Sequence, residues 1–284
     1  MKGLAGAHPA LTPDPSESRV DAFAEELIAA LDAPQPMAPF TTRDPSFDVR
    51  RAYEVAARVH AARRARGEQP VGRKIGFTNR NIWDEYGVHE PIWGFVYDTT
   101  LFRPRGGHAS VAIGGFAEPR IEPEIVLHFK SAPPVTRSEA AILDCIDWIA
   151  AGFEIVHSPF PDWKFKVADT IAGNGLHGIL VVGDPVPVAS IPDCAKRLRE
   201  FRITLKKGAA VAAEGGGANV LDSPLLAFAH LADVLAHLPQ SPPVAAGEVV
   251  TTGTLTSALR VAPGETWSTT IAGIGLPGLS ITFR

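Results

Sequence analysis

Cysteine is scarce in this 284-residue chain, which has only Cys145 and Cys194 and no CxxC pair. We therefore expect neither a disulfide framework nor a zinc site built from thiolates. The simplest interpretation is two free, buried thiols in a protein that works in a reducing compartment.

Long apolar runs and an excess of positive charge are also lacking. No run approaches the roughly 20 apolar residues of a membrane span, and residues 1–19 lack the apolar segment of a secretory signal. We therefore expect a cytoplasmic protein without a membrane partner. The formal net charge of −4 offers no field that would attract nucleic acid. A small anion would need only a local basic group or a metal.

The composition is otherwise that of a globular protein, with 45% hydrophobic and 20% charged residues. Gly, Pro and Ser near the start indicate a flexible tail over residues 1–18. We divide the remainder into an N-terminal helical region, residues 19–70, and a larger β-rich domain, residues 71–284.

Two helices are predicted in the N-terminal region. The first is indicated by apolar residues at helical spacing, namely Val20, Phe23, Leu27 and Leu31. The second is predicted from about Ser46 to Arg66, with Gly67 as its C-terminal cap.

After Val71, short β-rich runs alternate with Gly and Pro turns. The expected strands include residues 121–129, 179–182, 201–205, 249–252 and 280–283. A capping box at Thr136 and Glu139 predicts a helix over 138–150, and Ser223 followed by Pro224 predicts the start of another. This pattern indicates an α+β fold dominated by a rolled or sandwiched sheet.

An acidic pair lies in a strand-like stretch, residues 120–127. Strand side chains alternate, so Glu122 and Glu124 project to one face. Two carboxylates in an apolar strand are costly unless a hard cation such as Mg²⁺ or Mn²⁺ neutralises them. Pro123 suggests a sheet edge or a bulge. The alternative is a pair of exposed glutamates on a solvated face.

A third acid, Glu154, lies within the apolar run 152–156. Three carboxylates would leave about half of an octahedral metal shell for substrate and water. Lys74 lies between Gly72 and Gly76, which permit close approach of backbone or ligand. It is either a surface lysine or a proton-transfer group, and its spacing does not decide between them.

Other polar motifs are weaker. The segments 173–178 and 273–278 match GxGxxG but precede predicted strands, so we do not expect them to bind a dinucleotide. His157 and His177 lie near the acidic stretch, and either could enter the pocket, but a structural role is the expectation for each.

Taken together, these motifs resemble the hydratase/decarboxylase branch of the fumarylacetoacetate hydrolase superfamily. The resemblance extends over roughly residues 20–284. It is carried by the segments 72–78, 87–94, 120–125, 153–156, 162–163, 169–170 and 249–253, with Asn174.

The resemblance implies a mixed β-roll, Mg²⁺ or Mn²⁺, homo-oligomers, and substrates such as 2-hydroxypenta-2,4-dienoate or 4-oxalocrotonate. It implies that Glu122, Glu124 and Glu154 are metal ligands and that Lys74 transfers a proton. The positions it suggests for substrate binding are Arg73, Ile92, Asn174, Leu176 and Thr252.

Some positions depart from the branch. Ile92 stands where hydratases usually carry Asp and decarboxylases carry Ile, whereas Arg73, Trp163, Asp169 and Thr170 look more like hydratases. We therefore expect a metal-dependent lyase that acts on a small 2-oxo acid through a metal-bound enolate, with a hydratase favoured over a decarboxylase. An acylpyruvate-type C–C hydrolase and a non-catalytic binding module remain as alternatives.

Overall fold

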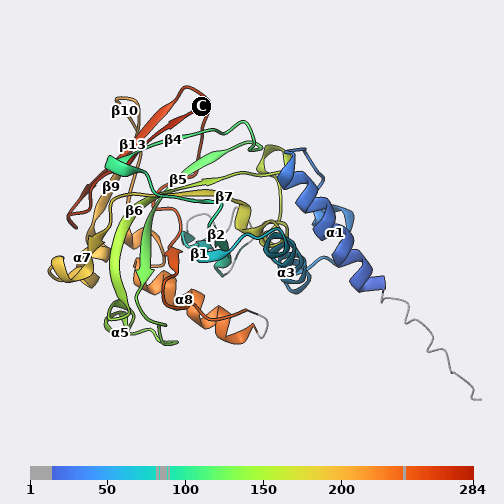
Figure 1. The fold of residues 1–284 in the computed structure, drawn as a ribbon, viewed down its shortest axis with the longest axis horizontal. Helices are drawn as coiled ribbons and strands as arrows, with labels where there is room; N and C mark the ends of the chain where they lie inside the picture. The colour runs from blue at the N-terminus through green and yellow to red at the C-terminus, as the bar shows by residue number, and fades with distance from the viewer. Residues whose placement is uncertain (1–14, 81–82, 84–87, 89, 239–240) are drawn as a thin grey trace, which may run out of the picture.

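The structure is a computed structural model that describes residues 15–80, 83, 88, 90–238 and 241–284. The fold is built on two mixed β-sheets, and the helices lie at one end and along one side of them (Figure 1). In the larger sheet the strands follow the order β2 (Ile92–Tyr97), β1 (Pro70–Gly76), β11 (Val249–Thr251), β5 (Arg120–Phe129), β6 (Ile146–Val156), β7 (His177–Val182) and β3 (Leu101–Phe102). Two short strands extend it, β12 (Leu259–Arg260) beside β5 and β8 (Val186–Pro187) beside β6.

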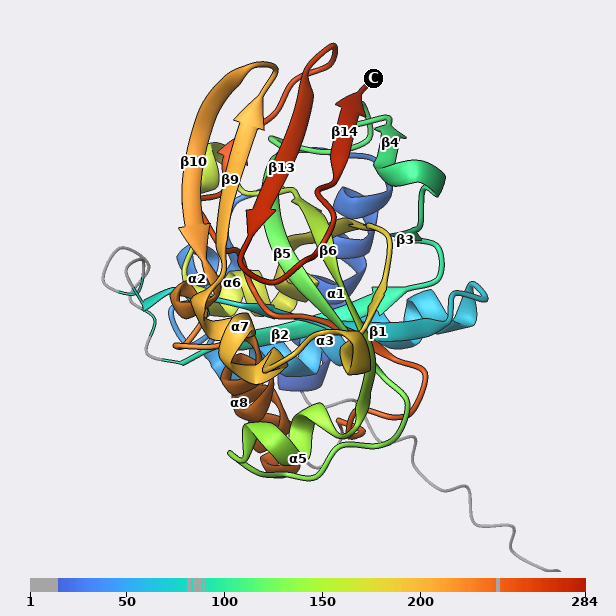
Figure 2. The same ribbon diagram turned by 90° about the vertical axis from the view of Figure 1, so that its left-hand side faces the viewer.

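The smaller sheet stands upright beside the larger one in Figure 2. Its order is β10 (Ala210–Gly216), β9 (Arg202–Lys207), β13 (Thr266–Ala272), β14 (Ser280–Phe283) and β4 (His108–Val111). Parallel pairs occur in both sheets, β1 with β11 and β3 with β7 in the larger, and β14 with β4 in the smaller. The prediction of an α+β fold with a mixed sheet is confirmed.

The N-terminal helices lie at one end of the molecule, opposite β9, β10 and α7 (Figure 1). They are α1 (Pro15–Asp32), the short α2 (Phe40–Arg43) and α3 (Val49–Ala65), and α6 (Val167–Ala172) packs against α3. The Asp48 side chain caps α3 by accepting a hydrogen bond from the backbone N–H of Arg51.

The start of α1 falls inside the predicted tail. Residues 1–14 of that tail lie outside the described part of the chain, whereas residues 15–18 are helical. A proline suits a first helical turn, because the N–H that it lacks would have no partner there. The helical region therefore begins at Pro15 rather than at residue 19.

The predicted helix over 138–150 is wrong in its second half. Only α5 (Glu139–Leu143) is helical, capped by Ser138 rather than Thr136, and Ile146 already belongs to β6. Ile142, Ile146 and Ile149 are nevertheless all buried in one core, as expected. A short apolar run does not distinguish a buried helix from a buried strand, and pairing with β5 decided in favour of the strand.

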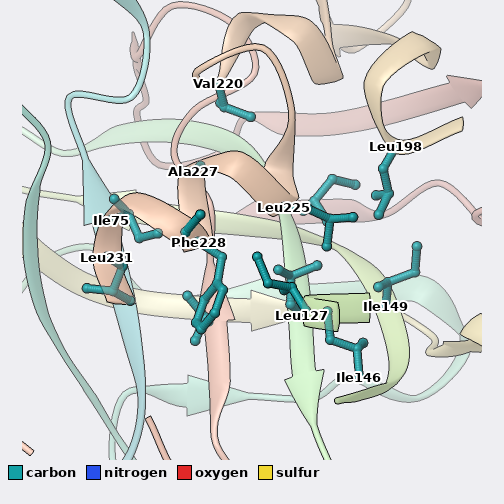
Figure 3. Close-up of a cluster of buried hydrophobic side chains, with 14 of the residues drawn as sticks. Ile75, Leu127, Ile146, Ile149, Leu198, Val220, Leu225, Ala227, Phe228 and Leu231 are labelled. Carbon is teal, nitrogen blue, oxygen red and sulfur yellow. The ribbon is translucent and has the colours of Figure 1, made fainter. Parts of the chain in front are cut away.

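Helix α8 (Pro224–His237) begins as predicted, because the Ser223 hydroxyl accepts a hydrogen bond from the N–H of Leu225. Figure 3 shows its Leu225, Phe228 and Leu231 in one cluster with Ile75 of β1 and Leu127 of β5. Here α8 covers the larger sheet together with α5 and α7 (Cys194–Glu200).

One described segment, Gly217–His237, is long and apolar enough to cross a membrane, with a mean hydropathy of 1.2. The expectation that no apolar run approaches this length was therefore too strict. Because 61% of its most apolar 18-residue stretch is buried inside the fold, the core accounts for these apolar side chains.

Strand alternation determines which side of the larger sheet each residue occupies. In β6, Phe153 and Ile155 pack in a core that also contains Leu205 and Trp267 of the smaller sheet. The residue between them, Glu154, therefore points to the other face of the larger sheet. The same alternation in β5 places its acidic residues on this face as well.

Candidate active site

Three carboxylates meet on the inner face of β5 and β6. Glu122 and Glu154 are direct cross-strand partners, and Glu124 lies two residues further along β5. One oxygen of each side chain lies within 4.8 Å of the others. The convergence predicted for the three glutamates is confirmed.

The strand that carries the pair is not an edge strand, contrary to the suggestion from Pro123. This residue faces Phe153 of β6, and its carbonyl accepts a hydrogen bond from the N–H of Leu255 on the opposite side. In a strand, the N and C=O of one residue point the same way, so the N–H that Pro123 lacks is not one that β6 would use. The proline therefore fits inside the sheet.

The electrostatics of the trio fit a cation. Burial, reinforced by repulsion from the other carboxylates, raises the pKa of Glu124 well above its ordinary value. Burial likewise raises the pKa of Glu122 to about 7, although Lys74 opposes it. Burial would also raise the pKa of Glu154, but Lys74 and His177 outweigh it and lower that pKa to about 2.

Two carboxylate oxygens, Oε1 of Glu124 and Oε2 of Glu154, are buried and make no hydrogen bond within the described part of the chain. Buried polar oxygens without a hydrogen-bond donor are costly unless an ion satisfies them. Three carboxylate ligands suit a hard divalent cation such as Mg²⁺ or Mn²⁺. The residues present therefore fit the metal that the sequence motifs suggest.

Lys74 extends from β1 into the same cluster and is 3% exposed. Its Nζ donates a hydrogen bond to the carbonyl of Gly175 at 2.9 Å and lies 3.3 Å from Oε2 of Glu154. Burial would lower the pKa of Lys74, but attraction to Glu154, Glu122 and Glu124 outweighs it and raises that pKa. Of the two roles that the sequence left open, the surface lysine is excluded.

A cavity of about 200 Å³ opens beside Lys74 and Glu122. The apolar part of its wall consists of Ile75, Phe77, Ile92, Val156, Trp163, Phe165, Leu176 and Ala258. Its polar lining comprises Thr78, Asn79, Arg120, Thr170, Thr254, Thr256 and Ser257. The cavity thus suits a small molecule with an acidic end near Lys74 and a mainly apolar body.

Two of the five suggested substrate-binding positions, Ile92 and Leu176, line this cavity. Arg73 does not, because it follows the opposite alternation to Lys74 in β1. Its guanidinium pairs with Glu248 at 2.5 Å and lies 4.4 Å from the ring centre of Phe95. The structure therefore gives Arg73 a buried ion pair in place of a substrate contact.

Thr252 and Asn174 are also turned away from the cavity. The Thr252 hydroxyl and N–H both donate to the carbonyl of Ile125. Both ends of the Asn174 amide are bonded to the main chain of Phe95, and Asn174 lines a separate cavity of about 280 Å³. Matching these two positions by sequence did not indicate which way their side chains point.

The two histidines take different places. His177 joins the site, because its Nδ1 lies 2.7 Å from Oε1 of Glu154 and its Nε2 lies 2.9 Å from the hydroxyl of Thr100. This arrangement orients Glu154, as partners of metal ligands commonly do. His157 is buried and stacks on Phe116, so its predicted structural role agrees with its surroundings.

Several residues at the site were not anticipated. The N–H of Gly253 donates to Oε2 of Glu124 at 2.7 Å, and Thr254, from the same loop, lines the cavity. Arg120 lies with its guanidinium 3.9 Å from the ring centre of Trp163. Arg120 lies two residues before Glu122, and this spacing was the signal that could have placed it on the same face.

Neither GxGxxG segment opens a helix. The segment 173–178 leads into β7 through the 3₁₀ turn η4 (Asn174–Leu176), and 273–278 connects β13 to β14. Both are turns into strands, as predicted.

The comparisons with known proteins agree with this geometry. The family model "Fumarylacetoacetate (FAA) hydrolase C-terminal" matches residues 85–277. A 2-hydroxyhexa-2,4-dienoate hydratase from Comamonas testosteroni is 32% identical over 93% of this chain and 97% of its own length. The chain belongs to the fumarylacetoacetate hydrolase superfamily, in its hydratase/decarboxylase branch. A 2-keto-4-pentenoate hydratase from Paraburkholderia xenovorans is 28% identical over 89% of this chain and 91% of its own.

Among solved structures, the 4-oxalocrotonate decarboxylase from Pseudomonas putida G7, complexed with magnesium and adipate, superposes with a TM-score of 0.86. It is 27% identical and covers 98% of this chain and 100% of its own. A fumarylpyruvate hydrolase from Pseudomonas aeruginosa, at 13% identity and a TM-score of 0.55 over 74% of this chain and 88% of its own, shares the fold alone. The expected family and fold are confirmed.

Proposed function

We propose that this protein is a divalent-metal-dependent hydratase that acts on a small 2-hydroxy-2,4-dienoate through the corresponding 2-oxo acid. One observation carries the proposal. Lys74 and Glu122 line a cavity with a largely apolar wall, and Glu122 converges there with the buried carboxylates of Glu124 and Glu154. A lysine that could move a proton to or from carbon, and three carboxylates that could hold a cation, therefore lie beside a cavity that could hold an unsaturated acid.

Glu122, Glu124 and Glu154 would hold Mg²⁺ or Mn²⁺, with His177 and the N–H of Gly253 orienting two of these carboxylates. When bound, the cation supplies a Lewis acid that stabilises negative charge on the oxygens of a 2-oxo acid.

Lys74 would deliver a proton to the substrate carbon or remove one from it, returning to the hydrogen bond with Gly175 between these steps. A cation held by the three carboxylates would offset the attraction that raises the pKa of Lys74, so that it could also act as a base. The apolar walls of the cavity would exclude bulk water from the rest of the substrate. They would therefore direct protonation and addition of water to the part of the substrate that lies beside Lys74 and the polar lining residues.

The hydratase is preferred because three hydratases are 28–32% identical to this chain and because Ile92, Val156 and Leu176 suit an uncharged tail. A 4-oxalocrotonate-type decarboxylase is the second candidate. It is supported by Arg120 in the cavity lining, which is placed to meet a second carboxylate, and by the isoleucine at position 92.

The test is to incubate the magnesium-loaded protein with 2-hydroxypenta-2,4-dienoate, 4-oxalocrotonate and an acylpyruvate, and to identify the products. Hydration of the dienoate that EDTA abolishes supports the proposal. Release of CO₂ from 4-oxalocrotonate without hydration of the dienoate replaces it with the decarboxylase. Cleavage of the acylpyruvate indicates a C–C hydrolase, and binding without any conversion indicates a binding module.

A further inference from the structure

The turn η4 lies between the active-site cavity and the second cavity. Asn174 lines the second cavity, whereas Gly175 and Leu176 line the first. All three residues have left-handed backbone angles, with φ of 55°, 64° and 60°. Asparagine and glycine tolerate this region better than other residues, but three in succession persist only where the surroundings hold them.

Asn174 supplies that restraint through an amide clamp, by which we mean its two hydrogen bonds to Phe95. Its Oδ1 accepts from the N–H of Phe95 at 2.7 Å, and its Nδ2 donates to the Phe95 carbonyl at 2.9 Å. The turn thereby packs directly on β2, so closely that a Cβ on Gly94 would lie 2.5 Å from the Asn174 carbonyl oxygen. Both polar ends of the Asn174 side chain are thus engaged with the protein.

The next residue in the turn holds the lysine. The Gly175 carbonyl accepts the hydrogen bond from Nζ of Lys74. A Cβ at Gly175 would lie 2.7 Å from Cδ of Lys74, so only glycine lets the lysine stem pass this close. The carbonyl opposes the pull of Glu154, whose Oε2 lies 3.3 Å from the same nitrogen.

We propose that Asn174 is a positioning residue for Lys74, since its amide clamp on Phe95 fixes the Gly175 carbonyl that holds the lysine nitrogen beside the cavity. This inference rests on the proposed role of Lys74 in proton transfer. It assigns Asn174 a role that differs from substrate binding. A lysine has four rotatable side-chain bonds, and displacing a catalytic group by about 1 Å can cost roughly 10²-fold in rate.

The test compares two substitutions that both tolerate the left-handed backbone. Asn174→Gly removes the clamp without adding strain at φ 55°. It should lower kcat by about 10- to 100-fold while KM stays within about threefold. Asn174→Asp keeps an acceptor for the Phe95 N–H but loses the donor to the Phe95 carbonyl, so it should recover part of the loss.

A second measurement does not depend on turnover. Competitive labelling with acetic anhydride, read by mass spectrometry, reports how freely the Lys74 amine is presented, with Lys207 as an internal standard. Labelling of Lys74 should change at least threefold in Asn174→Gly, while the affinity for Mg²⁺ stays within about twofold. Asn219→Ala is the matched control, because it removes another amide-to-carbonyl bond, to Leu255 at 2.9 Å, and should leave Lys74 labelling unchanged.

The outcomes separate the alternatives. Unchanged kcat and unchanged labelling in Asn174→Gly overturn the proposal. A raised KM with normal kcat makes Asn174 a substrate-binding residue, and a parallel loss of Mg²⁺ affinity shows a general structural role, so either result also overturns it. If the wild-type protein converts none of the substrates, the proposed function fails, and the labelling experiment still decides whether Asn174 controls Lys74.

Discussion

Replacing Lys74 with methionine tests the electrostatics and the chemistry of the site together. Methionine fills a similar volume but removes the positive charge from a cluster that contains Glu122, Glu124 and Glu154. It also leaves the Gly175 carbonyl without the donor that it has in the wild type. Removing one partner of a buried ion pair typically costs about 3–5 kcal/mol.

The loss of stability should depend on pH and on metal. Without metal, we expect Lys74→Met to lower the free energy of unfolding by about 3 kcal/mol at pH 8. The loss should shrink as the pH falls from 8 to 6, because Lys74 lowers the pKa of both Glu122 and Glu154 in the wild type. Without it these carboxylates take up protons at higher pH, and protonation relieves their repulsion. Saturating Mg²⁺ should remove much of the difference in the free energy of unfolding between Lys74→Met and the wild type. The cation replaces the missing positive charge and binds only the folded state.

Urea unfolding at pH 6 and pH 8, with EDTA or with Mg²⁺, measures these differences. Turnover of Lys74→Met should fall by roughly 10²–10⁴, and Lys74→Arg should not restore it, because arginine does not release its proton. If Lys74→Met is as stable as the wild type at pH 8 with EDTA, the electrostatic reasoning is wrong. Near-normal activity of Lys74→Arg would instead make Lys74 a charge that positions the substrate carboxylate.

Three further predictions concern the cluster, the cavity and the core. Glu124→Gln should weaken Mg²⁺ binding at least tenfold by calorimetry yet stabilise the metal-free protein, because it removes a buried carboxylate whose pKa is strongly raised; a destabilised variant would contradict this. Ile92→Asp places an acid in the cavity wall and should raise hydration of the dienoate relative to decarboxylation of 4-oxalocrotonate, whereas an unchanged ratio would show that position 92 does not decide the reaction. Burial lowers the pKa of His157 to about 4, so the unfolded chain takes up a proton first as the pH falls below 6.5. The free energy of unfolding should then decrease by up to about 3 kcal/mol between pH 6.5 and 4. In His157→Gln this part of the pH dependence should be absent from urea unfolding curves.

Local signals in the sequence were sufficient for the elements that carry their own start and stop residues. The cap at Ser223 predicted α8, apolar spacing predicted α1, and Gly67 predicted the end of α3. The segment after Ser138 lacked such a signal at its end, so its change from helix to strand at Ile146 was missed. Pairing with β5 is a contact between distant residues, and no local pattern encodes it.

The candidate site divides in the same way. Alternation along a strand is a local property, so it was enough to place Glu122 and Glu124 on one face. The direction in which a side chain points also depends on the residues that pack around its strand or turn. The side chains of Arg73, Asn174 and Thr252 point away from the cavity for this reason.

By itself, the sequence determined the family, the mixed α+β fold, and the residues from which a cation site could be built, because motif order and strand alternation are written in the chain. The tertiary structure alone decided that Glu154 faces Glu122 across β5 and β6, that Lys74 is buried among these carboxylates, and that His177 orients Glu154. The physical reason is that these contacts join strands far apart in the chain. These contacts bury charged groups and remove water from them, and the sequence alone does not show whether such groups are buried or exposed.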